Sequence, residues 1–360
     1  MSENSANKFY SWIDERFHIT PLVEFLKQKE VPVHRNSVWY YMGGVALFLF
    51  IIQVFTGILL LLYYQPGVDS AYESVRFITT KVSFGWLFRS IHSWSANLMV
   101  FVLFIHMFST FFSRAYRKPR ELTWVTGFIS LTLAMGFGFS GYLLPWNELA
   151  FFATKVGTDI VGAIPLIGES AKIVLRGGED VTGATLTRFY GIHVAVLPLL
   201  MTIFIALHLL FIQRQGMHEP EKFQKLPDEK KKTMPFFPNF ILRDALLWLI
   251  VLNVLLFLSV FFPWELGLKA DPFLSAPEGI RPEWYFMFMF QSLKLLPPHI
   301  FLLEGELIGV LFFAIAAIIW MLIPLLENKL GIKNKNVIMK IFGIVVVGFI
   351  LIMTIWGYSV

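Results

Sequence analysis

Residues 91–112 read IHSWSANLMVFVLFIHMFSTFF, an uninterrupted run of 22 residues without a charged side chain. A run of this length is typical of a helix that crosses the roughly 30 Å hydrocarbon core of a membrane. His92 and His106 lie within it, 14 residues apart. On a helix this spacing separates them by about 21 Å along the axis and by only about 40° around it. The run therefore predicts a spanning helix that presents two imidazoles on one face, near opposite membrane surfaces.

Six further windows are long and apolar enough to span a membrane. Of the 360 residues, 56% are hydrophobic and only 15% are charged, and the mean hydropathy is +0.64. A soluble domain carries about 25% charged residues. Open strands would leave peptide groups unpaired in lipid, so the spans are expected to be helices. We predict an all-α polytopic membrane protein with seven spanning helices, at 42–63, 91–112, 125–144, 192–212, 244–262, 307–326 and 338–357.

The composition also excludes several kinds of site. The chain contains no cysteine, which rules out disulfides, cysteine-bound iron–sulfur clusters and thioether-attached haem. The net charge of +5 does not indicate nucleic-acid binding, because the basic residues lie beside apolar spans and not on a polar face.

Basic residues are unevenly distributed between the loops. One set of segments holds 20 of the 30 Lys and Arg residues, namely 1–37, 113–123, 213–243 and 327–340. The positive-inside rule places this set, with the N-terminus, on the cytoplasmic or N side of the membrane. The remaining 10 lie in the loops of the opposite, P side, at 64–89, 145–188 and 263–300. A stretch around residues 9–17 favours a helix on the membrane surface.

A second pair of histidines lies in the fourth predicted span. His193 and His208 are 15 residues apart, which returns the chain to within about 60° of the same face. Because both helices run in the same direction, we expect His92 to face His193 near the P side and His106 to face His208 nearer the N side. Imidazole binds zinc, copper or haem iron. Two imidazoles on facing helices leave a flat slot that haem fills with both axial positions occupied.

Two other interpretations of the four histidines stay open: hydrogen bonding between helices and a proton relay. Arg89, one turn before His92, is a candidate partner for a haem propionate or, alternatively, an interfacial anchor. The first and third spans each contain two glycines that are 14 residues apart. Glycine would let a porphyrin edge approach the backbone, so this shared spacing favours haem. Close helix packing is the alternative for each one singly. These glycines are Gly43, Gly57, Gly127 and Gly141.

Five motifs follow one another along the chain: FGWLFRSIH at 84–92, KPRELTWVTG at 118–127, GYLLPW at 141–146, TLTRFY at 185–190 and PEWY at 282–285. In this order and at these membrane depths they resemble the cytochrome b of cytochrome bc and b6f complexes. The resemblance covers nearly the whole chain after about residue 30. It implies two non-covalent haem b groups, because the four histidines fall on the haem-ligand positions of the family.

The b6f branch of the family is the more similar one. Its second histidine pair also has a spacing of 15, its cytochrome b subunit resembles the first four spans, and its subunit IV resembles the last three. Tyr41 stands where that branch carries the cysteine that tethers an extra haem, so no covalent haem is expected. The division implied for this chain is an amphipathic N-side segment at 1–37, a four-helix dihaem domain at 38–215, a basic linker at 216–241 and a three-helix domain at 242–360.

The resemblance also implies a quinol oxidation site on the P side. Glu283 would accept a proton from the quinol, although a salt bridge or a helix N-cap is the alternative role for this carboxylate. Tyr285 would position the quinol or exclude water, and Tyr142 is assigned to the same catalytic group. The other residues expected to line this site are Pro145, Trp146, Pro282 and Trp284.

On the N side the family implies a site that reduces quinone. Asp244 would relay protons, and Arg214 would stabilise negative charge on the quinone, with Arg243 beside Asp244. Anchoring of the helix ends is the alternative for all three residues. Four histidines outside the spans are assigned no role: His18, His34, His218 and His299.

The predicted function is that of the dihaem core subunit of a quinol:electron-acceptor oxidoreductase of the bc1 or b6f type. It would oxidise quinol on the P side, pass electrons across the membrane to the N-side quinone site and contribute to the proton gradient. The implied partners are a Rieske iron–sulfur protein, a c-type cytochrome, lipid and a second copy of the chain, in the plasma membrane of a prokaryote. Two other functions stay open. One is a dihaem membrane anchor that reduces quinone for a dehydrogenase and would not need the motif at 282–285. The other is a non-redox transporter with histidine proton relays.

Overall fold

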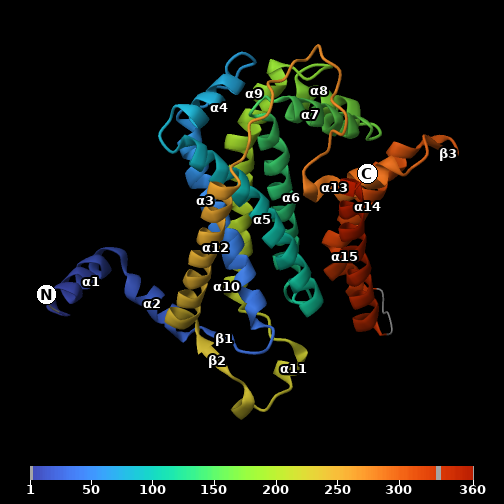
Figure 1. Cartoon of the computed structure of the whole chain (residues 1–360). Coiled ribbons are helices and arrows are strands. Elements are labelled where there is room, and N and C mark those ends of the chain that lie inside the picture. Colours follow the sequence, from blue (N-terminus) through green and yellow to red (C-terminus); the bar gives the residue numbers. More distant parts are fainter. Residues whose placement is uncertain (1–2, 330–333, 360) are drawn as a thin grey trace.

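The computed structural model describes residues 3–329 and 334–359. Within these residues seven helices are long and apolar enough to cross a membrane, which confirms the predicted class and number (Figure 1). The fourth span begins earlier than expected, at Gly183. The spanning helices are α3 (Tyr41–Leu61), α5 (Gly85–Ser113), α6 (Glu121–Leu143), the run of α9 (Gly183–Gly191) into α10 (Leu197–Gln215), α12 (Ile241–Phe261), α14 (Gly305–Lys329) and α15 (Lys335–Ser359).

Shorter elements lie beyond the spanning helices. One end of the bundle, called the linker end, carries α1 (Glu3–Phe17), α2 (Ile19–Gln28), α11 (Glu221–Gln224), 3-10 turns at Ser37–Tyr40 and Asp228–Lys230, and the antiparallel pair β1 (Glu30–Pro32) and β2 (Thr233–Pro235). The opposite end, called the loop end, carries α4 (Ala71–Thr80), α7 (Glu148–Gly162), α8 (Gly168–Arg176), α13 (Trp284–Lys294) and the pair β3 (His299–Ile300) and β4 (Leu303–Glu304). The long loops predicted at 145–188 and 263–300 therefore contain helices of their own.

The centre of the fold is built from α3, α5, α6 and α10. Helix α3 packs along α5, and α10 packs along α6, while α5 and α6 join the two pairs. Each of these helices contributes buried apolar side chains to one core, among them Leu49, Met99, Ala134 and Met201. Leu255 of α12 and Tyr285 of α13 complete the same core.

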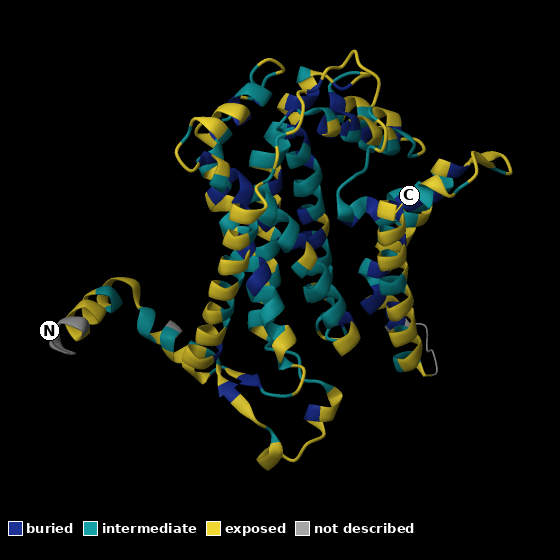
Figure 2. Ribbon diagram, viewed as in Figure 1, coloured by how far each residue is buried: buried dark blue, intermediate teal, exposed yellow. Residues whose placement is uncertain are grey.

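The outer surface of the bundle is apolar. Large hydrophobic side chains of α12 are exposed, including Leu246, Ile250 and Phe257. Figure 2 shows exposed residues along the outer faces of α12, α14 and α15. A continuous apolar surface of this extent would be unfavourable in water, whereas in a bilayer it contacts the acyl chains. The protein is therefore a multi-pass membrane protein.

The C-terminal helices reach the central bundle at two separate places. Helix α12 packs against α3 and α5, whereas α13 packs with α14 and α15. Helix α14 contacts α6, and α15 contacts α5. An aromatic cluster of Phe111, Tyr116, Trp124 and Trp320 fills the contact between α14 and the bundle. The division of the chain at residue 242 stays a prediction from sequence.

Candidate functional site

The four histidines of the spanning helices form two facing pairs. His92 and His106 lie on α5, His208 lies on α10, and His193 lies on the π-helical turn at Ile192–Val196 that joins α9 to α10. The ring centroids of His92 and His193 are 6.4 Å apart, and those of His106 and His208 are also 6.4 Å apart. The structure therefore brings the histidines together in the combinations that the sequence predicts.

The π-helical turn explains the unequal spacing of the two histidine pairs. A π turn closes its hydrogen bond over one residue more than an α turn and usually occurs as a single bulge within an α-helix. The extra residue at Ile192–Val196 accounts for the fifteenth step between His193 and His208. These two imidazoles can therefore face the same side of their helix, as the 14-residue pair on α5 does.

Each histidine ring lies against one glycine of a neighbouring helix. A Cβ at Gly127 or Gly141 would overlap the imidazole and one at Gly43 would be tight against it, whereas at Gly57 the contact would be an ordinary van der Waals one. The approach of a porphyrin edge to these glycines stays a prediction, and the protein atom nearest to the missing Cβ is in each case a ring carbon of histidine. The distances from that Cβ position to the ring Cε1 are 3.2 Å for Gly43 with His106, 3.4 Å for Gly57 with His92, 2.9 Å for Gly127 with His208 and 2.7 Å for Gly141 with His193.

Three of the rings are also oriented by a hydroxyl group that directly precedes the glycine. Such contacts at Nδ1 fix the ring and leave Nε2 as the nitrogen available to a metal. At the fourth ring the preceding residue is Met42, and Nδ1 of His106 is buried without a partner in the described part of the chain. The three distances to Nδ1 are 2.9 Å from Thr56 to His92, 3.0 Å from Ser140 to His193 and 3.2 Å from Thr126 to His208.

The geometry of each pair fits one metal atom between two imidazoles. A metal–imidazole bond is about 2 Å long, and two such bonds together with the radii of the rings account for the 6.4 Å between centroids. His92 and His193 line a cavity of about 450 Å³, and His106 and His208 line one of about 610 Å³. Both volumes are in the usual range for cofactor sites. The residues present therefore fit a haem in each cavity.

The cavity of His92 and His193 extends to Glu283, Tyr142 and Tyr285. Glu283 is the N-cap residue of α13, but its side chain makes no capping hydrogen bond. Burial raises the pKa of Glu283, and burial together with the nearby charge of Glu283 raises the pKa of Tyr285. A carboxyl group that holds its proton more firmly than usual therefore borders this cavity.

The side chain of Tyr285 lies against a glycine of α6, as each histidine ring lies against a glycine of a neighbouring helix. A Cβ added to Gly138 would come within 1.9 Å of the Tyr285 hydroxyl oxygen, so only glycine admits the phenol at this position. Pro145 lines the same cavity. The structure thus gathers Tyr142, Pro145, Glu283 and Tyr285 around one space.

Three other residues expected at this site lie elsewhere. Trp146 is only 1% exposed and packs against Phe151 in a separate core. Trp284 lines the cavity of the other histidine pair, and its Nε1 donates to Oδ1 of Asn97 at 3.0 Å. Pro282 is half-buried and is part of neither cavity lining.

Arg89 is buried at the loop end, where it also lines the cavity of His92 and His193. Its guanidinium donates to the carbonyl oxygens of Trp264 at 2.6 Å and Glu265 at 3.0 Å. Arg89 therefore holds the segment that follows α12. Contact with a haem propionate stays a prediction for this residue.

The residues expected at an N-side quinone site are not gathered around a cavity. Arg214 and Arg243 are exposed, and Asp244 is half-buried. A Cβ added to Gly44 would lie 2.2 Å from Oδ2 of Asp244, so this carboxylate rests against α3 next to Gly43. None of these three side chains is in the lining of either cavity.

Other polar residues occupy the linker-end part of the cavity that holds His106 and His208. They are His34, Tyr40, Arg120 and His218. Sequence reasoning missed them. The available signal was that His34 lies just before the first span and His218 just after the fourth, so both are at the same end of the bundle.

A bundle of membrane-spanning helices with facing histidine pairs at two depths defines a class: polytopic membrane proteins that hold cofactors between their helices. Residues 26–216 match the family model described as cytochrome b/b6/petB, and residues 269–360 match that of cytochrome b(C-terminal)/b6/petD. The chain belongs to the cytochrome b family.

Individual relatives agree with this assignment. The cytochrome bc complex cytochrome b subunit of Chlorobaculum thiosulfatiphilum is 49% identical over 350 residues, which are 97% of this chain and 80% of the relative. Cytochrome b6 of Synechococcus sp. (strain JA-3-3Ab) is 46% identical over 214 residues, 59% of this chain and 99% of the relative. A chain of a hyperthermophilic respiratory Complex III matches with a TM-score of 0.77 at 27% identity, covering 97% of this chain and 98% of that one.

Proposed function

We propose that this cytochrome b is the dihaem core subunit of a bc- or b6f-type quinol oxidoreductase. The observation that carries the proposal is that two facing histidine pairs lie at different depths along the same helices, with each ring against a glycine of a neighbouring helix. His92 with His193, and His106 with His208, would each hold one b-type haem. The attachment is non-covalent, since the chain has no cysteine. When bound, these haems carry single electrons from one end of the bundle to the other.

Quinol oxidation is assigned to the loop end. Oxidation of a quinol releases two protons and two electrons, so a proton acceptor is needed beside the hydroxyl groups. Glu283 suits this role because burial raises its pKa and makes its carboxylate a stronger base than an exposed one. Tyr142 and Tyr285 border the same space and would orient the quinol. Pro145 completes the contact surface, while Trp146, Pro282 and Trp284 would support it from outside the cavity.

The linker end is assigned to the cytoplasm. It carries most of the basic residues, including the run Lys230–Lys232, and the positive-inside rule places such segments on the cytoplasmic side. Quinone would be reduced at this end with protons from the cytoplasm. Asp244 remains a candidate relay, with Arg243 next to it in sequence, and Arg214, six residues after His208, remains a candidate for stabilising negative charge on the quinone. The membrane would be the plasma membrane of a prokaryote.

The proposed partners follow from the relatives and from the missing cysteines. A Rieske iron–sulfur protein would take one electron from each quinol, because this chain cannot bind such a cluster itself. A c-type cytochrome would accept that electron, and a second copy of the chain would complete a homodimer. The relative from Chlorobaculum thiosulfatiphilum is likewise a cytochrome bc complex subunit.

Two measurements on the purified complex test the proposal. We expect two b haems per chain in a reduced-minus-oxidised spectrum, and reduction of the Rieske protein when quinol is added. A chain without haem would contradict the proposal. Two haems with quinone reduction but no Rieske reduction would favour the alternative, a membrane anchor for a dehydrogenase.

A further inference from the structure

A short β-hairpin at the loop end exposes two large apolar side chains at its tip. Strands β3 and β4 connect α13 to α14, and the two residues between the strands are Phe301 and Leu302. Each of these residues is 97% exposed. Figure 1 shows the hairpin projecting sideways from the end of α14, away from the central bundle. No residue of the described chain therefore covers the tip.

The base of the hairpin is held against the helices on both sides of it. The N–H of Gly305 donates to the carbonyl oxygen of Pro298 at 2.9 Å, and a Cβ at Gly305 would lie only 2.0 Å from the carbonyl oxygen of Pro297. About one turn later, a Cβ at Gly309 would lie 2.4 Å from Cδ2 of Leu293 in α13. The hairpin is thus a fixed element that holds its tip at one place beside α14.

The two residues of the tip are unusual for a tight turn. A two-residue hairpin turn favours Gly, Asn or Asp, because it requires a positive φ. Phe301 has a φ of 56°, which is unfavourable for a bulky side chain. Local turn chemistry therefore does not explain Phe301 and Leu302, and a sequence that works against its own local structure is typical of a functional position.

The hairpin leads directly into the apolar outer surface of α14. This helix begins at Gly305, the residue after β4, and exposes Phe312 and Ile315 on its length. The strands of the hairpin carry the exposed polar residues His299 and Glu304. Apolar side chains at a tip and polar side chains near its base are typical of a segment that lies in the membrane interface, where the apolar groups enter the lipid and the polar groups stay in water.

We propose that this hairpin is a membrane-interface anchor, whose tip at Phe301 and Leu302 inserts into the lipid leaflet at the loop end of the bundle. Lipid is the occupant because the tip continues the lipid-facing surface of α14, and because its two side chains carry no polar group that would orient a protein partner. The contact holds the C-terminal end of α13 at the membrane surface. It does not depend on the proposed quinol chemistry.

The depth of the hairpin can be measured with a nitroxide label, because the chain has no cysteine. His299→Cys, at an exposed position two residues before the tip, carries the only label on this chain. The complex is placed in nanodiscs of phosphatidylcholine and phosphatidylglycerol, and electron paramagnetic resonance gives the collision rates of the label with oxygen and with a nickel chelate. Oxygen is concentrated among the acyl chains and the chelate stays in water, so the oxygen-to-nickel ratio rises with depth. Wild-type complex treated in the same way gives the background from cysteines of other subunits.

Two labelled positions supply reference values: Glu229→Cys in the charged linker for water, and Phe312→Cys on the outer face of α14 for acyl chains. We expect the ratio of His299→Cys to lie clearly above the water reference. Adding Phe301→Ser and Leu302→Ser should lower the ratio to the water reference, because serine removes the apolar surface that favours insertion. The matched control exchanges the two side chains, Phe301→Leu with Leu302→Phe, and should keep the ratio.

A ratio for His299→Cys equal to the water reference would overturn the proposal. Low collision rates with both reagents would also overturn it, because they would show that a protein subunit covers the tip. The same holds for a serine tip that leaves the ratio unchanged, or for an exchanged tip that lowers it as serine does. The first comparison leaves the tip intact, so it decides the question even if the serine variant does not fold. The haem spectrum should be the same in every variant, since no residue of 295–306 lines either histidine cavity.

Discussion

The ring of His193 occupies the space that a side chain at Gly141 would fill, since a Cβ there would come within 2.7 Å of the ring Cε1. This is the closest of the four glycine–histidine contacts. The preceding residue, Ser140, holds the same ring through Nδ1 at 3.0 Å. Two consecutive residues of α6 therefore admit and orient the imidazole that faces His92.

Substitution of Gly141 by alanine is expected to displace His193. Overpacking of this kind costs about 1–3 kcal/mol, and here the strain falls on a proposed haem ligand. We expect the haem between His92 and His193 to be lost or its spectrum to shift, measured by reduced-minus-oxidised spectroscopy. Gly348→Ala in α15 is the control, because no atom lies within 4 Å of its Cβ position. An unchanged spectrum in Gly141→Ala would show that the contact is not needed.

Removal of His208 is expected to affect one haem only. The two histidine pairs line separate cavities, so His208→Ala should empty the site shared with His106 and leave the site of His92 and His193 occupied. Potentiometric titration should then show one b-haem transition where the wild type shows two. Loss of both transitions, or of neither, would contradict the pairing.

Glu283→Gln is expected to slow quinol oxidation while both haems stay bound. In the wild type the ionised carboxylate accepts the proton, so the rate should rise with pH through the pKa of Glu283. Burial raises this pKa above its ordinary value of 4.5, which moves the rise to higher pH than for an exposed glutamate. Glutamine cannot accept the proton, and the step should disappear from the pH–rate profile. An unchanged profile would remove Glu283 from the mechanism.

The spanning helices were predictable from the sequence because lipid leaves the backbone few alternatives. The helices inside the long loops, such as α7 and α13, were not, because they are short and depend on tertiary contacts. The π-helical turn at Ile192–Val196 was also missed. Its only trace in the sequence was the 15-residue spacing of His193 and His208. Judged by α-helical periodicity alone, this spacing is only an imperfect match to one helix face.

Site residues were predictable where a residue type has few possible roles in its surroundings. Histidines inside a membrane have few roles, and their spacing fixed which would face each other. The positions of Trp146 and Trp284 could not be predicted, because a tryptophan fits a core as well as a cavity wall. His34 and His218 were missed since they lie outside the spans, and only the folded chain brings them to the same cavity.

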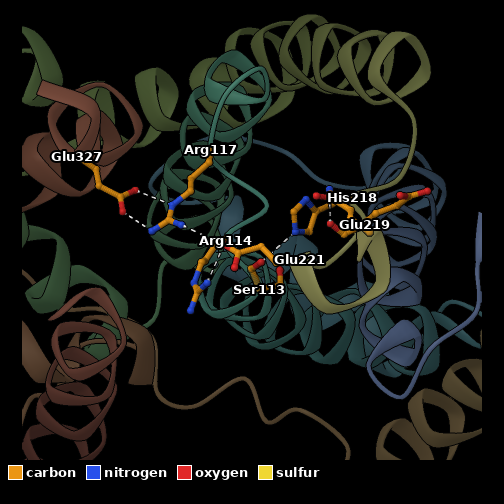
Figure 3. Close-up of polar contacts among 8 residues, drawn as sticks. Ser113, Arg114, Arg117, His218, Glu219, Glu221 and Glu327 are labelled. Atoms are coloured by element: carbon orange, nitrogen blue, oxygen red, sulfur yellow. Dashed lines mark hydrogen bonds and ion pairs between the residues drawn. The ribbon is translucent and has the colours of Figure 1, made fainter. Parts of the chain in front are cut away.

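A buried ion pair joins the central bundle to α14 at the linker end. Nε of Arg117, in the connection between α5 and α6, donates to Oε2 of Glu327 at 3.0 Å, and Nη2 of Arg117 donates to Oε1 (Figure 3). The side chain of Glu327 is 2% exposed and that of Arg117 is 19% exposed. Because the pair is bidentate and shielded from water, its loss should matter far more than that of a surface pair.

Glu327→Gln is therefore expected to lower the free energy of unfolding by up to about 3 kcal/mol. The guanidinium of Arg117 loses its bidentate carboxylate, while Oε1 of Glu221, 3.8 Å from Nη1 of Arg117, remains as a partial counter-charge. The double variant Arg117→Met with Glu327→Leu should lose less, since it leaves no unpaired charge. Thermal unfolding in detergent, followed by circular dichroism, gives the double-mutant cycle. Asp228→Asn, which breaks an exposed pair with Lys231, is the control and should not change the midpoint. If Glu327→Gln behaves like this control, the ion pair does not hold α14 on the bundle and the aromatic cluster around Trp320 does so alone.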